Sequence, residues 1–251
     1  MSLLSLDRLT VLRGGCPVVD GVSFEIGAGE VVGLIGPNGA GKTTLMRGAL
    51  GLLAASGGST LAALPARDRA RAVAWLPQAR EIAWPVTVET LVALGRSPYL
   101  AGGRKLSDAD RAAVARALKQ MGLADFARRD ATALSGGEQA RVLIARVLAQ
   151  ETPLIVADEP VAGLDPAHQF SLMRVFSSLA TRGTSVLVSL HDLGLAARHC
   201  TRLVMIHRGK LVANGAPREV LSDDLLRDVF QVSGRWDGDS FQVTRALEGA
   251  A

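Results

Sequence analysis

The chain has 251 residues, of which 48% are hydrophobic, enough for one large domain or for a domain with a subdomain. Its net charge of +4 comes from scattered basic residues, so we expect a mildly basic protein that does not bind nucleic acid. No apolar run approaches the roughly 18 residues of a membrane-spanning helix, and we expect no signal peptide. Cys16 and Cys200 form no metal-binding pair and indicate a reducing compartment.

Two antiparallel strands are predicted at the N-terminus. Residues 22–26 alternate apolar and polar side chains, the pattern of a half-buried strand. Residues 3–12 are its expected partner, with the turn at Arg13-Gly14-Gly15. Further along, residues 56–59 read SGGS, and we expect a loop there.

A phosphate-binding loop is the most informative motif. It follows the apolar run 31–35, precedes the helix-like run 45–50, and has the G-x-x-x-x-G-K-[ST] spacing. In such a loop, backbone N–H groups and a helix N-terminus bind phosphate. Lys42 would contact the β- and γ-phosphates, and Thr43 would offer its hydroxyl to Mg²⁺. The residues expected to bind nucleotide here are Gly36, Asn38, Gly39, Ala40, Gly41, Lys42, Thr43 and Thr44.

A mostly helical stretch comes next. A short strand is predicted at residues 73–77, and residues 79–150 are then mostly helical. Within them, Ser107 precedes a helix that should run to Met121 and stop at Gly122.

A glycine-rich helix start lies near the end of this stretch. Residues 134–139 read LSGGEQ and open the apolar helical run 140–149. Ser135 and Glu138 fit the capping box S-x-x-E, an ordinary helix start. A helix N-terminus with two glycines and a hydroxyl can equally be a second anion site. The residues alone leave both interpretations open.

Two carboxylates end a buried strand predicted at residues 154–158. Asp158 can hold Mg²⁺ through water, and Glu159 is placed to polarise an attacking water, as in phosphate-loop enzymes. A solvated strand end is the alternative interpretation, but the phosphate loop upstream favours the catalytic pair.

The rest of the chain continues the alternation of strands and helices. Strands are predicted at residues 185–190 and 203–206, the second leading into a hairpin through Arg208-Gly209. A final helix is expected at about residues 223–232. Strands separated by helices predict an α/β fold with a parallel sheet.

In this order, the motifs resemble the ATP-binding cassette (ABC) family over nearly the whole chain. The matching segments are the Walker A loop (36–44), the Q-loop Gln78, the signature (134–139), Walker B (154–159), the D-loop (162–165) and the switch His191. The resemblance implies a single ABC-type nucleotide-binding domain over residues 1–251. That fold has a RecA-like P-loop core, an antiparallel β subdomain and a helical subdomain inserted at about residues 79–152.

The resemblance also implies an ATPase that uses ATP and Mg²⁺. Glu159 would be the general base, His191 would contact the γ-phosphate, and Gln78 would sense Mg²⁺ and water. The residues implied to hold the metal are Thr43, Gln78 and Asp158. Two copies would pair head to tail around ATP. Their shared interface would contain Ser135, Gly137 and Asp165.

A subfamily is indicated by residues 94–99 and 190–198, which resemble importers of iron–siderophore chelates, haem and cobalamin. Gly194 stands where that group usually has Asn. The resemblance implies an integral membrane permease as partner, a substrate-binding protein acting indirectly, and a peripheral location on the cytoplasmic side of the inner membrane. A ferric siderophore is the first expectation for the substrate, followed by haem or cobalamin. An exporter subunit, or a soluble ABC ATPase acting on nucleic acid, are the alternatives.

The adenine-stacking position departs from the family pattern. The family usually places an aromatic ring there, whereas this chain has Arg13 at the matching position. A guanidinium plane can stack on a purine, but Arg13 can equally be a solvated loop residue. We therefore expect weak discrimination between purine nucleotides.

Overall fold

The computed structural model describes residues 2–78, 81–100 and 105–247. The chain divides into two compact units, the first formed by Met1–Leu64 and Phe176–Ala251 and the second by Pro65–Val175. The single domain with an inserted helical subdomain stays a prediction. Residue 79, where that subdomain would begin, and parts of the predicted helical stretch 79–150 lie outside the described residues.

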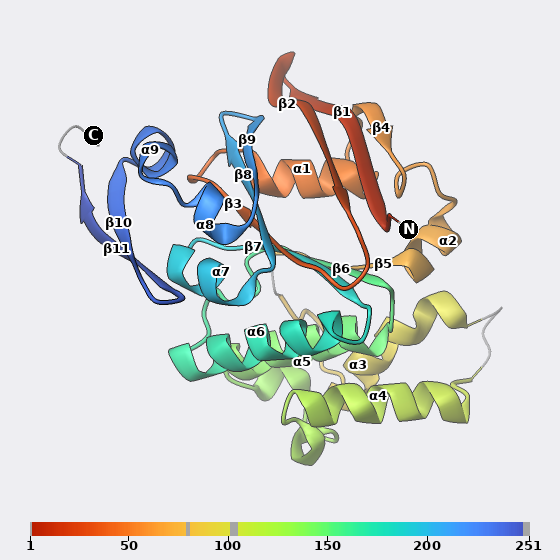
Figure 1. The fold of residues 1–251 in the computed structure, drawn as a ribbon. Helices are drawn as coiled ribbons and strands as arrows, with labels where there is room; N and C mark the ends of the chain where they lie inside the picture. The colour runs from red at the N-terminus through yellow and green to blue at the C-terminus, as the bar shows by residue number, and fades with distance from the viewer. Residues whose placement is uncertain (1, 79–80, 101–104, 248–251) are drawn as a thin grey trace. The chain divides into compact units, whose positions relative to one another are not determined.

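The first unit contains a mainly parallel sheet with strand order β7-β3-β8-β9 (Figure 1). Strand β3 pairs in parallel with β7 and β8, which confirms the predicted parallel arrangement, and β9 adds the predicted hairpin to β8. The parallel strands are almost continuously apolar because they are buried on both faces. The bounds are β3 Val31–Ile35, β7 Ser185–Ser189, β8 Arg202–His207, β9 Lys210–Gly215, and helices α1 Lys42–Ala49, α7 Leu193–His199 and α8 Pro217–Val220.

A smaller antiparallel sheet of the same unit has the order β2-β1-β4. Strands β1 (Leu4–Arg13) and β2 (Cys16–Ile26) confirm the predicted N-terminal hairpin. The loop predicted at 56–59 is wrong, because Ser56–Ser59 forms β4, which pairs with β1. The reason is a close backbone approach, since a Cβ on Gly57 would lie 2.3 Å from the carbonyl oxygen of Arg8. Glycine is therefore what allows this strand to pair.

The C-terminal segment of the first unit corrects a second prediction. The helix expected at 223–232 ends at Phe230, as the short α9 (Asp223–Leu225) and the π-turn η4 (Leu226–Phe230). Gln231 takes the left-handed conformation that ends the turn. A hairpin that the sequence did not predict follows, formed by β10 (Val232–Asp237) and β11 (Ser240–Ala246).

The second unit is mostly helical, with one parallel strand pair, β5 (Val73–Leu76) and β6 (Leu154–Ala157). Its core is formed by α3, α4 and α5, which pack on one another. The predicted α4 is confirmed, with Ser107 and Asp110 forming a capping box and Met121 as C-cap. The helical elements are α2 Ala66–Ala72, α3 Val88–Ala93, η1 Leu94–Tyr99, α4 Asp108–Gln120, η2 Ala124–Phe126, η3 Ala131–Ala133, α5 Gly136–Ala149 and the start of α6 Pro166–Ala180.

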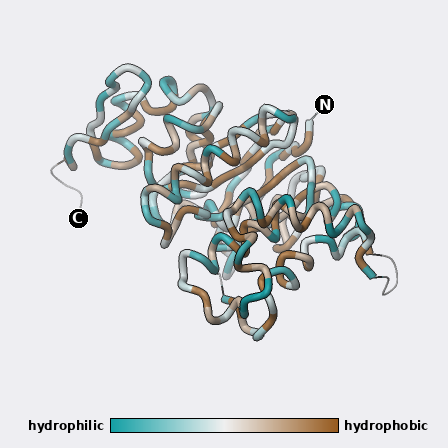
Figure 2. Tube along the Cα trace, turned by 90° about the horizontal axis from the view of Figure 1, so that it is seen from below, coloured by the Kyte–Doolittle hydropathy of each residue, from teal (hydrophilic) through white to brown (hydrophobic). Residues whose placement is uncertain are grey.

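The helices are amphipathic rather than uniformly apolar. In Figure 2 the tube alternates between hydrophobic and hydrophilic colours along them. Within the described ranges, no helix combines the length and the hydrophobicity required to cross a bilayer.

A buried guanidinium holds the helical elements of the second unit together. Arg96, only 7% exposed, donates from Nε to Asp110 at 2.9 Å and from Nη1 to the carbonyl oxygen of Ala149 at 2.8 Å. Its guanidinium carbon also lies 4.1 Å from the centre of the Tyr99 ring. The neighbouring Gly95 packs so closely that a Cβ there would lie 2.2 Å from the carbonyl oxygen of Arg146. The segment 94–99, which forms η1, is therefore bonded to both α4 and α5.

We predict that Asp110→Asn destabilises the protein in a pH-dependent way. Hydrogen bonds from the Ser107 hydroxyl and backbone, and then from Arg96, lower the Asp110 pKa from 3.8 to about 2. The ionised carboxylate is favoured in the folded state, so its stabilisation is complete above pH 3.8 and is lost as the pH falls toward 2. Urea unfolding midpoints should therefore differ most from wild type near neutral pH, and the difference should shrink on acidification.

The matched control is Asp108→Asn in the same first turn of α4, where the carboxylate is exposed and pairs only with exposed Arg111. That variant should unfold close to wild type at every pH. A stability loss in Asp110→Asn that stays constant from neutral pH down to pH 2 would contradict the role of the ionised carboxylate.

Candidate functional site

The phosphate loop joins β3 to α1 in the conformation that the sequence predicts. Gly39 and Gly41 have φ angles of 77° and 103°, in the left-handed region that favours glycine. A Cβ on Gly36 would lie 2.2 Å from the carbonyl oxygen of Ile206, so only glycine fits. No side chain caps the N-terminus of α1. The N–H groups of its first turn, which lack partners within the helix, therefore point toward the loop.

Lys42 lies inside this loop, with only 6% of its surface exposed. Its Nζ donates to the carbonyl oxygens of Gly36 at 2.7 Å and Pro37 at 3.0 Å. Thr43 is half-buried and Thr44 is buried beside it. A buried ammonium next to an uncapped helix start concentrates positive potential in a small volume. The loop is therefore suited to a compact polyanion.

The acidic pair follows β6 in the second unit. Asp158 is fully buried, and its backbone N–H donates to the carbonyl oxygen of Leu76 on β5 at 2.9 Å. The side chain of Gln78 donates from Nε2 to Oε2 of Glu159 at 2.8 Å. The structure thus brings together two of the predicted catalytic residues, which the sequence places far apart.

Glu159 also has an unusual backbone conformation. Its φ angle is 49°, which is sparsely populated for residues other than glycine. Strained residues of this kind persist where the surrounding structure holds them, and they concentrate at functional sites. In this backbone conformation the Glu159 carboxylate accepts the hydrogen bond from Gln78.

The signature helix α5 begins with the capping box that the sequence allowed. The hydroxyl and the backbone N–H of Ser135 donate to Oε2 of Glu138 at 2.7 and 2.8 Å. These bonds lower the pKa of the Glu138 carboxyl. Gly136 and Gly137 have open space where a Cβ would stand. The capping interpretation is confirmed, while the second anion site stays a prediction.

The D-loop carboxylate is held in place by a neighbour. Asp165 accepts hydrogen bonds from the backbone N–H of His168 at 2.8 Å and, in one tautomer, from its ring Nδ1 at 2.7 Å. Both bonds, the backbone one first, lower the pKa of Asp165. The sequence argument gave His168 no role beside Asp165, although their spacing of three residues at a helix start was the available signal.

The switch residue His191 is exposed at the end of β7, just before α7. The next residue, Asp192, caps this helix by accepting a hydrogen bond from the backbone N–H of Leu195 at 2.9 Å. Arg13 is exposed at the end of β1, paired with Cys16 across the turn. Its role toward a nucleotide base stays a prediction.

The predicted site residues occur in both units. The first unit contains the phosphate loop, Arg13 and His191. The second unit contains Gln78, Ser135, Gly137, Asp158, Glu159 and Asp165.

Comparison with known families and proteins gives a consistent result. The ABC transporter family model matches residues 19–162. The hemin import ATP-binding proteins of Rhodococcus jostii and Streptomyces coelicolor are 44% and 45% identical to this chain, covering 90% and 91% of it and 79% and 83% of themselves. The cobalamin import ATP-binding protein of Halobacterium salinarum is 41% identical over 90% of this chain, which spans 58% of that protein.

Solved structures show the same fold. A structure described as a metal-chelate type ABC transporter, in an inward-facing conformation, matches with a TM-score of 0.82 and 24% identity, covering 97% of this chain and 96% of its own. An ATP-binding subunit of an ABC transporter matches with a TM-score of 0.76 and 28% identity, covering 90% and 92%. The first match shows the fold alone, because its identity is low.

We predict that Glu159→Gly is more stable than Glu159→Ala. The left-handed conformation costs an L-residue about 1–2 kcal/mol, while the extra freedom of glycine in the unfolded chain offsets about 0.4–1 kcal/mol. The glycine variant should therefore lead by about 0.5–1 kcal/mol in denaturant unfolding. Equal midpoints for the two variants would show that the backbone at this position is not strained.

Proposed function

Because this chain belongs to the ABC transporter family and is an ATPase, we propose that it is the ATP-binding subunit that powers import of a metal chelate. The observation that carries this proposal is the identity of 44–45% with hemin import ATP-binding proteins over nine tenths of the chain. Those relatives favour haem as substrate, with cobalamin next. Ferric siderophore, the first expectation from the motifs, becomes the third candidate.

The phosphate loop supports the ATP-binding role. Its donors are the first-turn N–H groups of α1, and its cation is the buried Lys42. A triphosphate would replace the carbonyl oxygens of Gly36 and Pro37 as the partners of the ammonium. Binding would then place phosphate oxygens against the buried ammonium.

Mg²⁺ fits the oxygen donors that the chain offers. The buried Asp158 carboxylate, the Thr43 hydroxyl and the Gln78 amide oxygen are the hard ligands that this cation prefers. When bound, the ion would neutralise charge on the phosphates. Asp158 would act through a water molecule.

Hydrolysis would depend on Glu159, Gln78 and His191. Phosphoryl transfer needs positioning and charge neutralisation more than covalent help. Glu159 would orient the attacking water and accept its proton, and His191 would contact the γ-phosphate. The 2.8 Å hydrogen bond from Gln78 occupies the Glu159 carboxylate. Gln78 would therefore have to release Glu159 before the carboxylate could accept that proton.

A second copy of the chain would complete each ATP site. Ser135 and Gly137 would cover the nucleotide bound to the partner copy, and Asp165 would lie at the interface between copies. The open space at Gly136 and Gly137 supports this, because it would let a phosphate approach the start of α5. The Ser135 hydroxyl would turn from Glu138 toward that phosphate.

The permease is the proposed membrane partner, and its contact would place the chain on the cytoplasmic side of the inner membrane. Large apolar side chains are exposed after the Q-loop, with Trp84 at 75% and Leu94 at 53%. Exposed apolar groups of this size suit a protein interface. A substrate-binding protein would act indirectly, through the permease.

We predict that Glu159→Gln retains ATP binding and stops turnover, because the amide cannot accept the proton of water. ATP with Mg²⁺ should then hold the variant as a dimer in size-exclusion chromatography. Lys42→Ala is the contrasting variant and should lose ATP binding itself. A Glu159→Gln protein that hydrolyses ATP at the wild-type rate would remove Glu159 from the proposed role.

We predict that Leu94→Asp impairs chelate uptake without lowering the ATPase activity of the isolated protein. Leu52→Asp is the matched control, because Leu52 is also 53% exposed but lies in the first unit. The assay restores each variant to a deletion strain and measures growth and labelled uptake with haem, cobalamin or a ferric siderophore. If the deletion strain takes up haem, cobalamin and the ferric siderophore normally, the importer function is refuted. If Leu94→Asp and Leu52→Asp impair uptake equally, the proposed contact of Leu94 with the permease is refuted.

A further inference from the structure

The C-terminal hairpin approaches the first turn of α7 at an unusually short distance. A Cβ on Gly194 would lie 2.9 Å from the carbonyl oxygen of Phe241 on β11 and 3.2 Å from Oδ1 of Asp192. Any side chain there would have to displace either the hairpin or the carboxylate that caps the helix.

The capping carboxylate is covalently next to the switch residue. Oδ1 of Asp192 accepts the hydrogen bond of the Leu195 N–H at 2.9 Å, which fixes the backbone at the start of α7. His191 shares a peptide bond with Asp192. A shift of the cap would therefore change the direction of the His191 side chain.

The hairpin is itself anchored away from His191. Phe241 is 4% exposed and packs edge-on against Trp236, with ring centres 5.3 Å apart. The guanidinium of Arg218, on α8, lies 4.4 Å from the centre of the Trp236 ring. Arg218 also donates to the carbonyl oxygen of Gly238, in the turn of the hairpin. These contacts fix the β11 backbone that meets Gly194.

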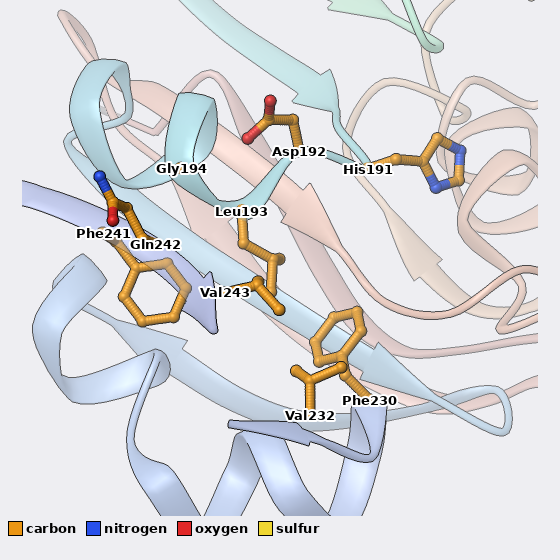
Figure 3. A pocket seen from close by; sticks show the side chains of 9 residues that line it. All are labelled: His191, Asp192, Leu193, Gly194, Phe230, Val232, Phe241, Gln242 and Val243. Atoms are coloured by element: carbon orange, nitrogen blue, oxygen red, sulfur yellow. The ribbon is translucent and has the colours of Figure 1, made fainter. Parts of the chain in front are cut away.

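A pocket of about 730 Å³ separates the rest of the hairpin from the switch segment. Figure 3 shows apolar side chains from both sides gathered at its centre, with His191 directed away from them. The lining residues from the hairpin side include Val232, Phe241 and Val243. The hairpin strand β11 packs on α7, and the contact of Phe241 with Gly194 is the place where backbone meets backbone without an intervening side chain.

We propose that the C-terminal hairpin positions the switch histidine, with Gly194 and Phe241 as the positioning residues at their contact. The inference rests on the proposed role of His191 toward the γ-phosphate. A displaced hairpin would leave ATP binding intact, because the phosphate loop lies outside this contact, but would misplace His191 for hydrolysis. A misplacement of about 1 Å can cost about 10²-fold in rate.

The first test loosens the hairpin without touching the switch segment. Arg218→Ala removes the contacts of Arg218 with Trp236 and Gly238, and it should lower kcat. The KM for ATP should stay within roughly twofold of wild type, because ground-state binding is unchanged. Arg227→Ala is the matched control, because the two arginine side chains are 57% and 59% exposed and Arg227 pairs only with the nearby Asp224. Arg227→Ala should leave kcat and KM as in wild type.

The second test adds a methyl group at the contact itself. Gly194→Ala should lower kcat by roughly 10- to 100-fold at unchanged ATP affinity. Gly27→Ala is its control, because a Cβ there would meet only Glu30, at 3.5 Å, an ordinary contact distance. Thermal unfolding of the four variants shows whether each is folded. If Gly194→Ala does not fold, the result with Arg218→Ala tests the inference.

A double-mutant cycle separates positioning from a general structural effect. In the His191→Ala background, Arg218→Ala should cause no further loss in single-turnover hydrolysis, because there is no imidazole left to misplace. Equal losses in both backgrounds, or normal kcat in Arg218→Ala and Gly194→Ala, would overturn the inference. Normal hydrolysis in His191→Ala itself would instead refute the proposed role of His191.

Discussion

The buried ammonium of Lys42 is the charge on which the rest of the site depends. It lies beside the uncapped start of α1, where the helix adds partial positive charge of the same sign. Two backbone carbonyl oxygens offset part of this unfavourable arrangement. A triphosphate would meet both the ammonium and the helix start, so the folded loop already holds the groups that would bind it. The reactions that the other site residues perform would then be coupled to occupancy of one anion site.

Patterns between neighbouring residues made much of the fold predictable. The N-terminal hairpin, the strand–loop–helix arrangement at residues 31–49 and the cap at Ser107 depend on spacing within a few residues, and all are confirmed. The error at residues 56–59 arises where a distant segment decides the outcome. Ser56–Ser59 pairs with β1 because Gly57 fits closely against Arg8, and the C-terminal hairpin is held by contacts of Trp236 with Arg218 and Phe241. In the hairpin, by contrast, the two-residue turn Gly238-Asp239 was a local signal that the sequence argument did not use.

The candidate site also combines features that the sequence predicts with features that only the fold reveals. The residue types at the phosphate loop and at Asp158-Glu159 were enough to propose a chemistry for them, whereas the bond between Gln78 and Glu159 required the fold. The left-handed backbone of Glu159 could not be predicted from the sequence either, because glutamate has no preference for a positive φ. At Ser135 the sequence allowed two interpretations, and the structure shows that the hydroxyl already has a partner in Glu138. An anion at this helix start would have to compete with that carboxylate.

The Arg96 network gives the second unit a mechanical property. Its guanidinium bonds to Asp110 on α4 and to Ala149 at the end of α5, while Gly95 seats η1 directly on the α5 backbone. Such contacts resist shear between these elements. A push on the exposed Leu94 would therefore bear directly on the last turns of α5, at Arg146 and Ala149, because backbone contacts leave little room for side chains to absorb it.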